Sequence, residues 1–338
     1  MLEPNLLLAY HNMNDADQFI EQHPWMINLK KDPIQLLFNA APLPIRYQLL
    51  VHIMEDTSSE DFLSLQKNLR KHLPRRKILA EQNAHGLWPV DGKVSGLKPE
   101  QMEILQRLKQ QEVLHQLLDY SVTHKQEKVK LGMREVIRSL GEHKLPLRLH
   151  HQSQAVFLAI VYGLEGNPII KQLIRDLIGD QNSDGGWSSL SEEKQSCYWS
   201  SLFFLWTMGH SQKFKGNRAL KKGLDYVQSK LLQEGESTLL PGMQVWDTLI
   251  SGVSGLSILS GGTLRYLEML QLIDEKNHDR KTYKLLDWLL DAQLKTGLWP
   301  SIVGRDRQGD FGVTLRVLKV LKHFQSQRVI ETLKYDSE

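Results

Sequence analysis

The chain has 338 residues, of which 41% are hydrophobic and 24% charged, the balance of a folded protein with a sizeable core. Its 42 basic and 39 acidic residues leave a net charge of +3, which by itself indicates no anionic partner. The lone Cys197 excludes an internal disulfide and favours a reducing, cytoplasmic compartment, and no apolar run reaches the ~20 residues that span a bilayer.

The first 44 residues show no pattern that assigns their structure. Two roles are open for this N-terminal segment: it plugs a cavity, or it replaces a missing part of the fold. From residue 45 onward helical periodicity dominates, and the alternation typical of β-strands is nearly absent.

The predicted helices are of two kinds that alternate along the chain. The strongly apolar set covers residues 45–54, 101–120, 152–164, 198–208, 245–259 and 311–324. The amphipathic set covers residues 61–79, 128–140, 169–178, 218–232 and 281–290. Because a helix that is apolar on most sides must be surrounded, the alternation predicts six inner helices inside an outer ring. We therefore predict an all-α fold, an (α/α)6 toroid that forms a single domain over residues 45–338.

Basic residues cluster near the end of the first amphipathic helix. The cluster comprises Lys67, Arg70, Lys71, Arg75, Arg76 and Lys77. Contact with nucleic acid or with anionic lipid is one interpretation. No stacking aromatic residues are interleaved with the basic ones, as single-strand binding requires. We therefore favour a solvated outer face over nucleic acid, and peripheral membrane contact stays open.

One phrase, Gln-x-x-x-Gly-x-Trp, occurs three times, each time directly after an amphipathic helix. The copies are Gln82-Gly86-Trp88, Gln181-Gly185-Trp187 and Gln293-Gly297-Trp299. The glutamine is placed to bond carbonyls at the helix end or amides of a neighbouring helix, glycine relieves the turn, and tryptophan packs beneath it. The repeat predicts stacked structural units, so we interpret these residues as scaffold.

These motifs resemble the QW motifs of squalene and oxidosqualene cyclases. That fold is shared with class II diterpene cyclases and, more loosely, with protein prenyltransferase β subunits. The segments 184–187, 197–199, 244–248 and 286–293 also follow in the order that such terpenoid cyclases show. The resemblance covers about residues 78–325, and it implies an isoprenoid or other apolar ligand in a central cavity.

The chain departs from the catalytic patterns of both families. In squalene-type cyclases an Asp-x-Asp-Asp-Thr motif delivers the proton, but here residues 310–314 place Gly312 where the middle aspartate stands. The usual acid is therefore missing. The zinc-ligand pattern of the prenyltransferases is also incomplete in this chain, because Gln195 and Val313 take the places of an aspartate and a histidine. We expect no metal and no cofactor.

Candidate site residues lie at the N-terminal ends of the inner helices, where unsatisfied amides make a mildly positive mouth. The candidate catalytic residues are Asp247 and Asp310, and the candidate ligand-binding residues are His150, His151, Cys197, Tyr198, Trp199, Gln244, Trp246, Arg305 and Phe311. Asp247 is a proton donor provided that burial keeps it protonated, the aromatic faces suit a carbocation, and Arg305 suits a diphosphate.

Each candidate also has a structural interpretation. A carboxylate near a helix start caps exposed amides, which applies to both Asp247 and Asp310. The tryptophans are equally suited to packing in the core. His150 and His151 are equally compatible with a loop before a helix, and Arg305 with a solvated loop.

Two functional hypotheses follow. The first is a terpenoid cyclase-like toroid that binds an apolar ligand, and whose enzymatic activity, if present, is protonation-initiated class II cyclisation. The second is a catalytically inactive toroid that serves as a protein-interaction scaffold.

Overall fold

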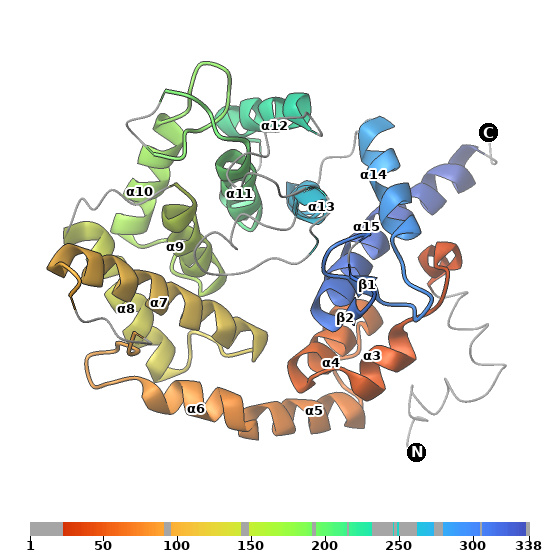
Figure 1. The fold of residues 1–338 in the computed structure, drawn as a ribbon, viewed down its shortest axis with the longest axis horizontal. Helices are drawn as coiled ribbons and strands as arrows, with labels where there is room; N and C mark the ends of the chain where they lie inside the picture. The colour runs from red at the N-terminus through yellow and green to blue at the C-terminus, as the bar shows by residue number, and fades with distance from the viewer. Residues whose placement is uncertain are drawn as a thin grey trace. The chain divides into compact units, whose positions relative to one another are not determined.

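The computed structural model describes residues 23–90, 96–142, 149–190, 194–214, 216–231, 246, 249, 262–273, 280–304 and 306–335, without the side chains of 141–142 and 325–335. These residues are mostly helical, and the strand content within them is one two-residue pair (Figure 1). The predicted all-α class is confirmed. None of the described helices is long and apolar enough to cross a bilayer.

The chain forms two compact units. The central unit spans Leu73–Asp274, and the terminal unit joins Met1–His72 to Glu275–Glu338. The single domain expected over residues 45–338, with a separate segment before it, stays a prediction.

The central unit contains alternating helices. These are α6 (Leu73–Glu81), α7 (Pro99–Asp119), α8 (Glu127–Glu142), α9 (Leu149–Val161), α10 (Pro168–Gly179), α11 (Tyr198–Gly209), η3 (Gln212–Phe214), α12 (Arg218–Lys230) and α13 (Gly262–Ile273). Helix α11 packs between α9 and α13, and every one of its residues is buried. Helices α10 and α12 lie beside α9 and α11 in Figure 1 and bury one face each. This is the predicted two-layer arrangement of an α/α toroid.

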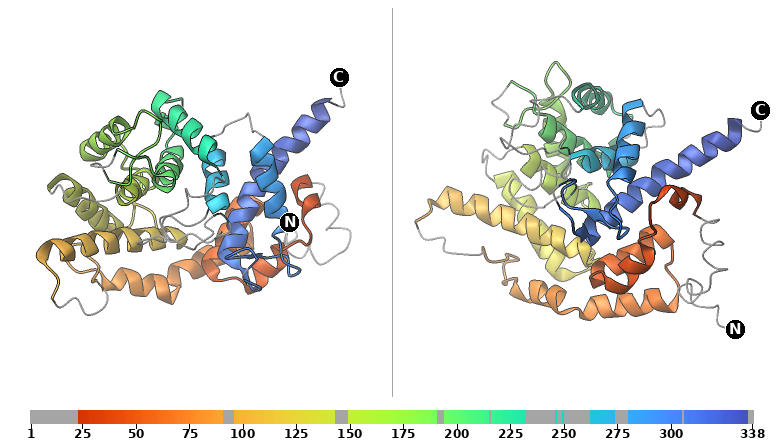
Figure 2. Two further views of the ribbon diagram at one scale, coloured as in Figure 1. Left: turned by 45° about the horizontal axis from the view of Figure 1, so that its top comes forward. Right: turned by 45° about the vertical axis from the view of Figure 1, so that its right-hand side comes forward.

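The terminal unit brings the beginning and the end of the chain together. Its elements are η1 (Pro24–Asn28), α3 (Ile34–Ala40), α4 (Leu43–Leu49), η2 (Leu50–Met54), α5 (Glu60–Lys71), α14 (Arg280–Asp291), β1 (Trp299–Pro300), β2 (Gly309–Asp310) and α15 (Phe311–Tyr335). Helix α15 packs against η1, α4 and η2 (Figure 2). The two strands pair antiparallel, with Trp299 opposite Asp310.

A small apolar cluster holds α4, η2 and α5 together. Leu50, Phe62 and Leu65 are buried in it, and the ring of Tyr47 stacks on that of Phe62 with centroids 5.4 Å apart. Lys322 of α15 donates to the carbonyl of Ile53 at 2.9 Å, which ties the end of η2 to the last helix.

From residue 45 onward the predicted helices agree with the described ones except at three places, and α3 lies in the preceding segment, for which no structure was predicted. The helix expected over 61–79 is two helices, because Pro74 has no N–H to donate to the preceding turn and so ends α5. Helix α13 was not predicted. The apolar helix expected over 245–259 lies outside the described residues, apart from positions 246 and 249.

Candidate functional site

The three Gln-x-x-x-Gly-x-Trp motifs have the same internal geometry. Each indole Nε1 donates to the carbonyl ten residues earlier, and each glutamine Nε2 donates to the motif glycine's carbonyl. The indole bonds are Trp88 to Ile78 at 2.7 Å, Trp187 to Leu177 at 2.7 Å and Trp299 to Leu289 at 2.6 Å. The motif glycines have φ of 85° at Gly86, 91° at Gly185 and 93° at Gly297, a left-handed conformation that other residues rarely adopt.

Each motif glutamine also reaches the start of another helical segment. Gln82 Nε2 donates to the carbonyl of Lys128 in α8 at 2.9 Å, and Gln181 Nε2 donates to that of Ala219 in α12 at 2.7 Å. These bonds dock each motif on the outer helix that follows it. The sequence predicted carbonyls at the preceding helix end or amides of a neighbouring helix as partners, and the described bonds go instead to a carbonyl at the start of the neighbouring helix.

In the third motif the N-terminal segment takes the place of that following helix. Gln293 Nε2 donates to the carbonyl of Lys31 at 2.7 Å, and Gln293 Oε1 accepts from the backbone N–H of Lys30 at 2.7 Å. The turn before α3 therefore serves as the outer partner of the last repeat. Of the two roles left open for this segment, replacement of a missing part is the one that these bonds support.

The motif tryptophans also hold the next inner helix. The backbone N–H of Trp187 donates to Ser201 Oγ of α11 at 2.8 Å, and that of Trp299 donates to Thr314 Oγ1 of α15 at 2.9 Å. In the first motif the acceptor is Gln110 Oε1 of α7, at 3.0 Å. Each motif thus links an outer helix, the next inner helix and a further outer segment.

The second motif sets the position of the candidate site. The carbonyl of Trp187 accepts from the N–H of Cys197 at 2.8 Å, directly before α11. Two residues on, the carbonyl of Ser189 accepts from the N–H of Leu149, the first residue of α9. Both inner helices therefore begin at the same loop, which brings their N-terminal candidate residues to one end of the central unit.

Three aromatic side chains meet at this end, and we call them the α11 aromatic cluster: Tyr198, Trp199 and Trp246. The ring centroids of Tyr198 and Trp199 are 4.9 Å apart, and Trp246 lies 5.2 Å from the first and 5.0 Å from the second. The first two are buried and Trp246 is half-buried. Trp199 Nε1 is buried without a hydrogen-bond partner among the described residues, although a buried indole N–H usually finds one.

Three polar candidates also lie at this end. His150 is buried and His151 half-buried at the start of α9, with their ring centroids 4.2 Å apart. Cys197 is half-buried at the position before α11. The structure thus gathers five of the sequence-predicted residues on two neighbouring helix starts, with Trp246 packed against them.

Asp310 and Phe311 belong to the terminal unit. Asp310 Oδ1 accepts from the N–H of Val313 at 2.8 Å, and its Oδ2 accepts from Ser301 Oγ at 3.2 Å. Asp310 is therefore an N-terminal cap of α15, as the structural interpretation expects. Phe311 is half-buried at the first position of that helix. The remaining candidates, Gln244, Asp247 and Arg305, lie outside the described residues.

A second aromatic group, near the other end of α11, already contains a cation. Arg265 of α13 is buried, and its guanidinium carbon lies 4.2 Å from the ring centroid of Trp206 and 5.5 Å from that of Phe203. Its Nη1 is 3.8 Å from an oxygen of Glu268. Because the guanidinium occupies these ring faces, they are not available to a cationic ligand.

His210 also belongs to this second group. Its ring meets that of Trp206 edge-on at 4.7 Å, and burial lowers its pKa from 6.5 to about 4, a shift that Glu268 opposes and Arg265 reinforces. Sequence reasoning missed this group because α13, which supplies the arginine, was not predicted. In the described part of the chain no three His, Cys, Asp or Glu side chains are grouped to hold a metal ion.

No protein-family model and no curated protein matches the chain. Among solved structures it is similar to type II terpene cyclase MstE from Scytonema. A variant of MstE in complex with geranylgeranyl dihydroxybenzoate matches with 10% identity and a TM-score of 0.43, over 84% of this chain and 87% of that one. The ligand-less MstE matches with 12% identity and a TM-score of 0.30, over 77% of this chain and 99% of that one.

Proposed function

We propose that the protein binds an isoprenoid or another apolar ligand through the α11 aromatic cluster. The observation that carries the proposal is the meeting of Tyr198, Trp199 and Trp246 at the shared starts of α9 and α11. Aromatic faces bury large apolar areas and attract developing positive charge. The resemblance of the three repeats to those of terpenoid cyclases supports the same ligand class.

Binding is better supported than cyclisation. A class II cyclase needs a carboxylic acid held neutral and strong enough to protonate an alkene. Gly312 stands where the resemblance places that acid, and Asp310 accepts an amide hydrogen bond as a helix cap. If the protein is an enzyme, the acid is Asp247, and the reaction is a protonation-initiated cyclisation with a degenerate motif.

Thermal stabilisation tests the proposal. A ligand that binds only the folded state adds about 2.7 kcal/mol at one hundred times its dissociation constant. We expect geranylgeraniol, geranylgeranyl diphosphate or squalene to raise the unfolding temperature of the wild type. Trp246→Leu should weaken this effect, whereas Trp206→Phe, in the group that Arg265 occupies, should keep it. Equal responses of the two variants would refute the assignment of the ligand to the α11 aromatic cluster.

Product analysis then separates binding from turnover. Incubation with the ligand that stabilises best, followed by mass spectrometry of the extracted lipid, should return the ligand unchanged. A cyclised product that disappears in Asp247→Asn but not in Asp310→Asn would establish the degenerate cyclase instead.

The alternative, an inactive interaction scaffold, is favoured by one surface. None of the nine residues of α6 is buried, and Arg76 and Lys77 are exposed on it. Leu73 at its start is 73% exposed. Reversing the charges of Arg76 and Lys77 should abolish capture of an acidic protein partner if this surface is the docking site, and unchanged capture would remove that support.

A further inference from the structure

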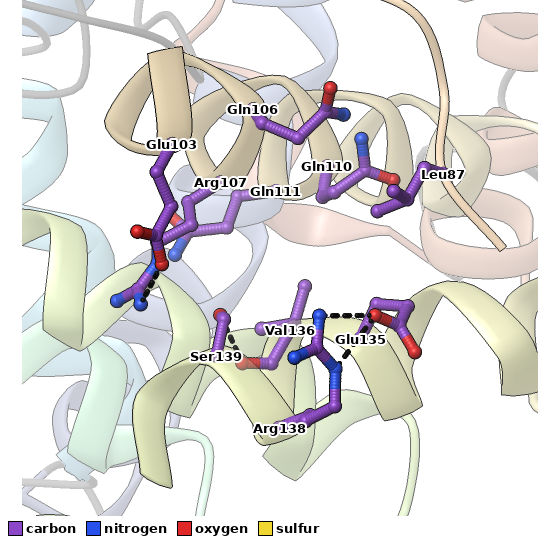
Figure 3. A pocket seen from close by; sticks show the side chains of 10 residues that line it. All are labelled: Leu87, Glu103, Gln106, Arg107, Gln110, Gln111, Glu135, Val136, Arg138 and Ser139. Atoms are coloured by element: carbon purple, nitrogen blue, oxygen red, sulfur yellow. Dashed lines mark hydrogen bonds and ion pairs between the residues drawn. The ribbon is translucent and has the colours of Figure 1, made fainter. Parts of the chain in front are cut away.

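Two clusters of charged side chains lie outside the α11 aromatic cluster. The first lines a small pocket between α7 and α8, where Arg107 pairs with Glu103 and Arg138 pairs with Glu135, each at 2.8 Å (Figure 3). Each pair joins residues of the same helix, three or four positions apart, so neither pair holds two elements together. The second cluster surrounds Lys322 of α15, and it does join two elements.

Lys322 closes the end of η2. Its Nζ donates to the carbonyl of Ile53 at 2.9 Å, to that of His52 at 3.3 Å and to Glu55 Oε1 at 2.6 Å. The last carbonyls of a helix lack donors from their own helix, and here a lysine 269 residues further along the chain supplies the donor for Ile53. These three bonds hold α15 to η2 within the terminal unit.

The backbone at this junction is unusual. Leu50–Met54 form one turn of π-helix, a rare conformation that is frequent at functional sites. Glu55, which follows as the C-cap, is left-handed with a φ of 54°, a region that residues other than glycine rarely adopt. Such a conformation persists only where the surrounding contacts enforce it. The turn therefore depends on its bonds to Lys322 more than an ordinary helix end would.

Two groups at this junction change charge in acid. The hydrogen bond and charge of Lys322 hold the pKa of Glu55 below its ordinary value of 4.5. Burial, and then the charges of Lys319 and Lys322, lower the pKa of His52 from 6.5 to about 4. Both pKa values are lower in the folded chain, so the junction is most stable above pH 6.5 and weakens as the pH falls toward 4. Part of the His52 side chain is exposed, and solvent screens some of this repulsion.

The other charged groups around the junction fit this picture. His23, directly before η1, also has a lowered pKa, because burial and Lys322 lower it more than Glu55 raises it. Charged side chains of the neighbouring helices have other contacts. Arg46 of α4 lies over a phenyl ring of α3. Asp56 accepts backbone N–H bonds from the turn that begins α5.

We propose that Lys322, Glu55 and His52 form an acid-sensitive latch, which holds α15 on η2 at neutral pH and releases it as the pH falls. A protonated Glu55 no longer attracts the lysine, and a protonated His52 repels it. Release loosens α15 around Lys322, whereas its first turn stays fixed because the N–H of Trp299 donates to Thr314 Oγ1. The latch does not depend on the isoprenoid proposal, because it shares no residue with the α11 aromatic cluster.

Hydrogen exchange of the full chain, followed by mass spectrometry of its peptides at pH 7 and pH 5, tests the latch. After correction for the direct effect of pH on exchange, we expect the amides of η2 and of α15 around Lys322 to exchange severalfold faster at pH 5. The reason is that at this pH His52 takes up a proton far more readily in the open state than in the closed one. Helices α9 and α11 should keep their protection, because none of the latch residues belongs to the central unit.

Three variants of the full chain separate the roles. His52→Gln removes the titrating ring but keeps the backbone carbonyl that Lys322 bonds, so most of the extra exchange at pH 5 should disappear. His85→Gln, at an exposed loop position of the central unit, should leave that extra exchange unchanged. Lys322→Met removes the donor itself, so η2 and α15 should exchange fast already at pH 7.

Three results would overturn the proposal. The first is equal protection of η2 and α15 at the two pH values, and the second is extra exchange at pH 5 that His52→Gln leaves unchanged. The third is extra exchange that α9 and α11 share equally, which would show unfolding of the whole chain. The wild type and His52→Gln decide the question even if Lys322→Met does not fold.

Discussion

Replacing Gly223 by alanine tests how the tryptophan repeat packs. Gly223 lies inside α12, where alanine normally stabilises a helix by about 0.5–1 kcal/mol. Here a Cβ would stand 2.4 Å from Cζ3 and 2.7 Å from Cη2 of the Trp187 ring. That ring cannot move away easily, because it is buried and its Nε1 bonds the carbonyl of Leu177. Overpacking of this kind costs about 1–3 kcal/mol, so we expect Gly223→Ala to lose about 1–2 kcal/mol net.

Urea denaturation followed by circular dichroism measures this loss. The control is Gly179→Ala in α10, where an added Cβ meets nothing within 4 Å and should be neutral or mildly stabilising. Combining Gly223→Ala with Trp187→Phe removes the ring that the new methyl group meets, so part of the loss should be recovered as a coupling energy. Equal stabilities of the Gly223 and Gly179 variants, or strict additivity in the double variant, would refute the packing argument.

The remaining predictions concern three side chains. Gln181→Met removes the donor to two backbone carbonyls and should cost about 1–3 kcal/mol in urea denaturation; a loss within 0.5 kcal/mol, the range of ordinary surface changes, would contradict the scaffold role. Asp310→Ala should cost about 1 kcal/mol because a helix cap is lost, whereas Asp310→Asn, which still caps, should cost less; the reverse order would argue against capping. The pKa of His210 falls from 6.5 in the unfolded chain to about 4 in the folded one. Its contribution to the free energy of unfolding is therefore complete above pH 6.5 and is lost as the pH falls toward 4. His210→Leu should therefore reduce the loss of unfolding free energy between pH 6.5 and 4, measured by urea denaturation at each pH. His85→Leu, at an exposed loop position, should not change that loss.

Periodicity alone predicted most of the helices, because an inner and an outer helix differ in how many of their sides are apolar. It missed α13, in which Arg265 and Glu268 suggest a solvated face. Both side chains lie inside the central unit. There the ring of Trp206 and the carboxylate of Glu268 both compensate the charge of Arg265. It also missed the break at Pro74, which a local rule on proline would have found.

The packing of each motif tryptophan under its turn could be predicted because its indole bonds a helix carbonyl only ten residues earlier in the sequence. The bond between Gln293 and Lys31 could not, because it joins positions 262 residues apart and no local pattern encodes it. The glycines at 132 and 223 escaped for the same reason: each makes room for a tryptophan of a different element. At the candidate site the sequence identified the aromatic residues of α11, but only the loop at Trp187 and Ser189 shows that α9 begins beside them.

Native mass spectrometry of gently purified protein tests the central claim most directly. We predict a co-purifying lipid or prenyl mass, or a one-to-one adduct when geranylgeraniol is added, and its loss in the Trp246→Leu variant. A spectrum that shows only the bare chain before and after addition would contradict an apolar binding site at the α11 aromatic cluster.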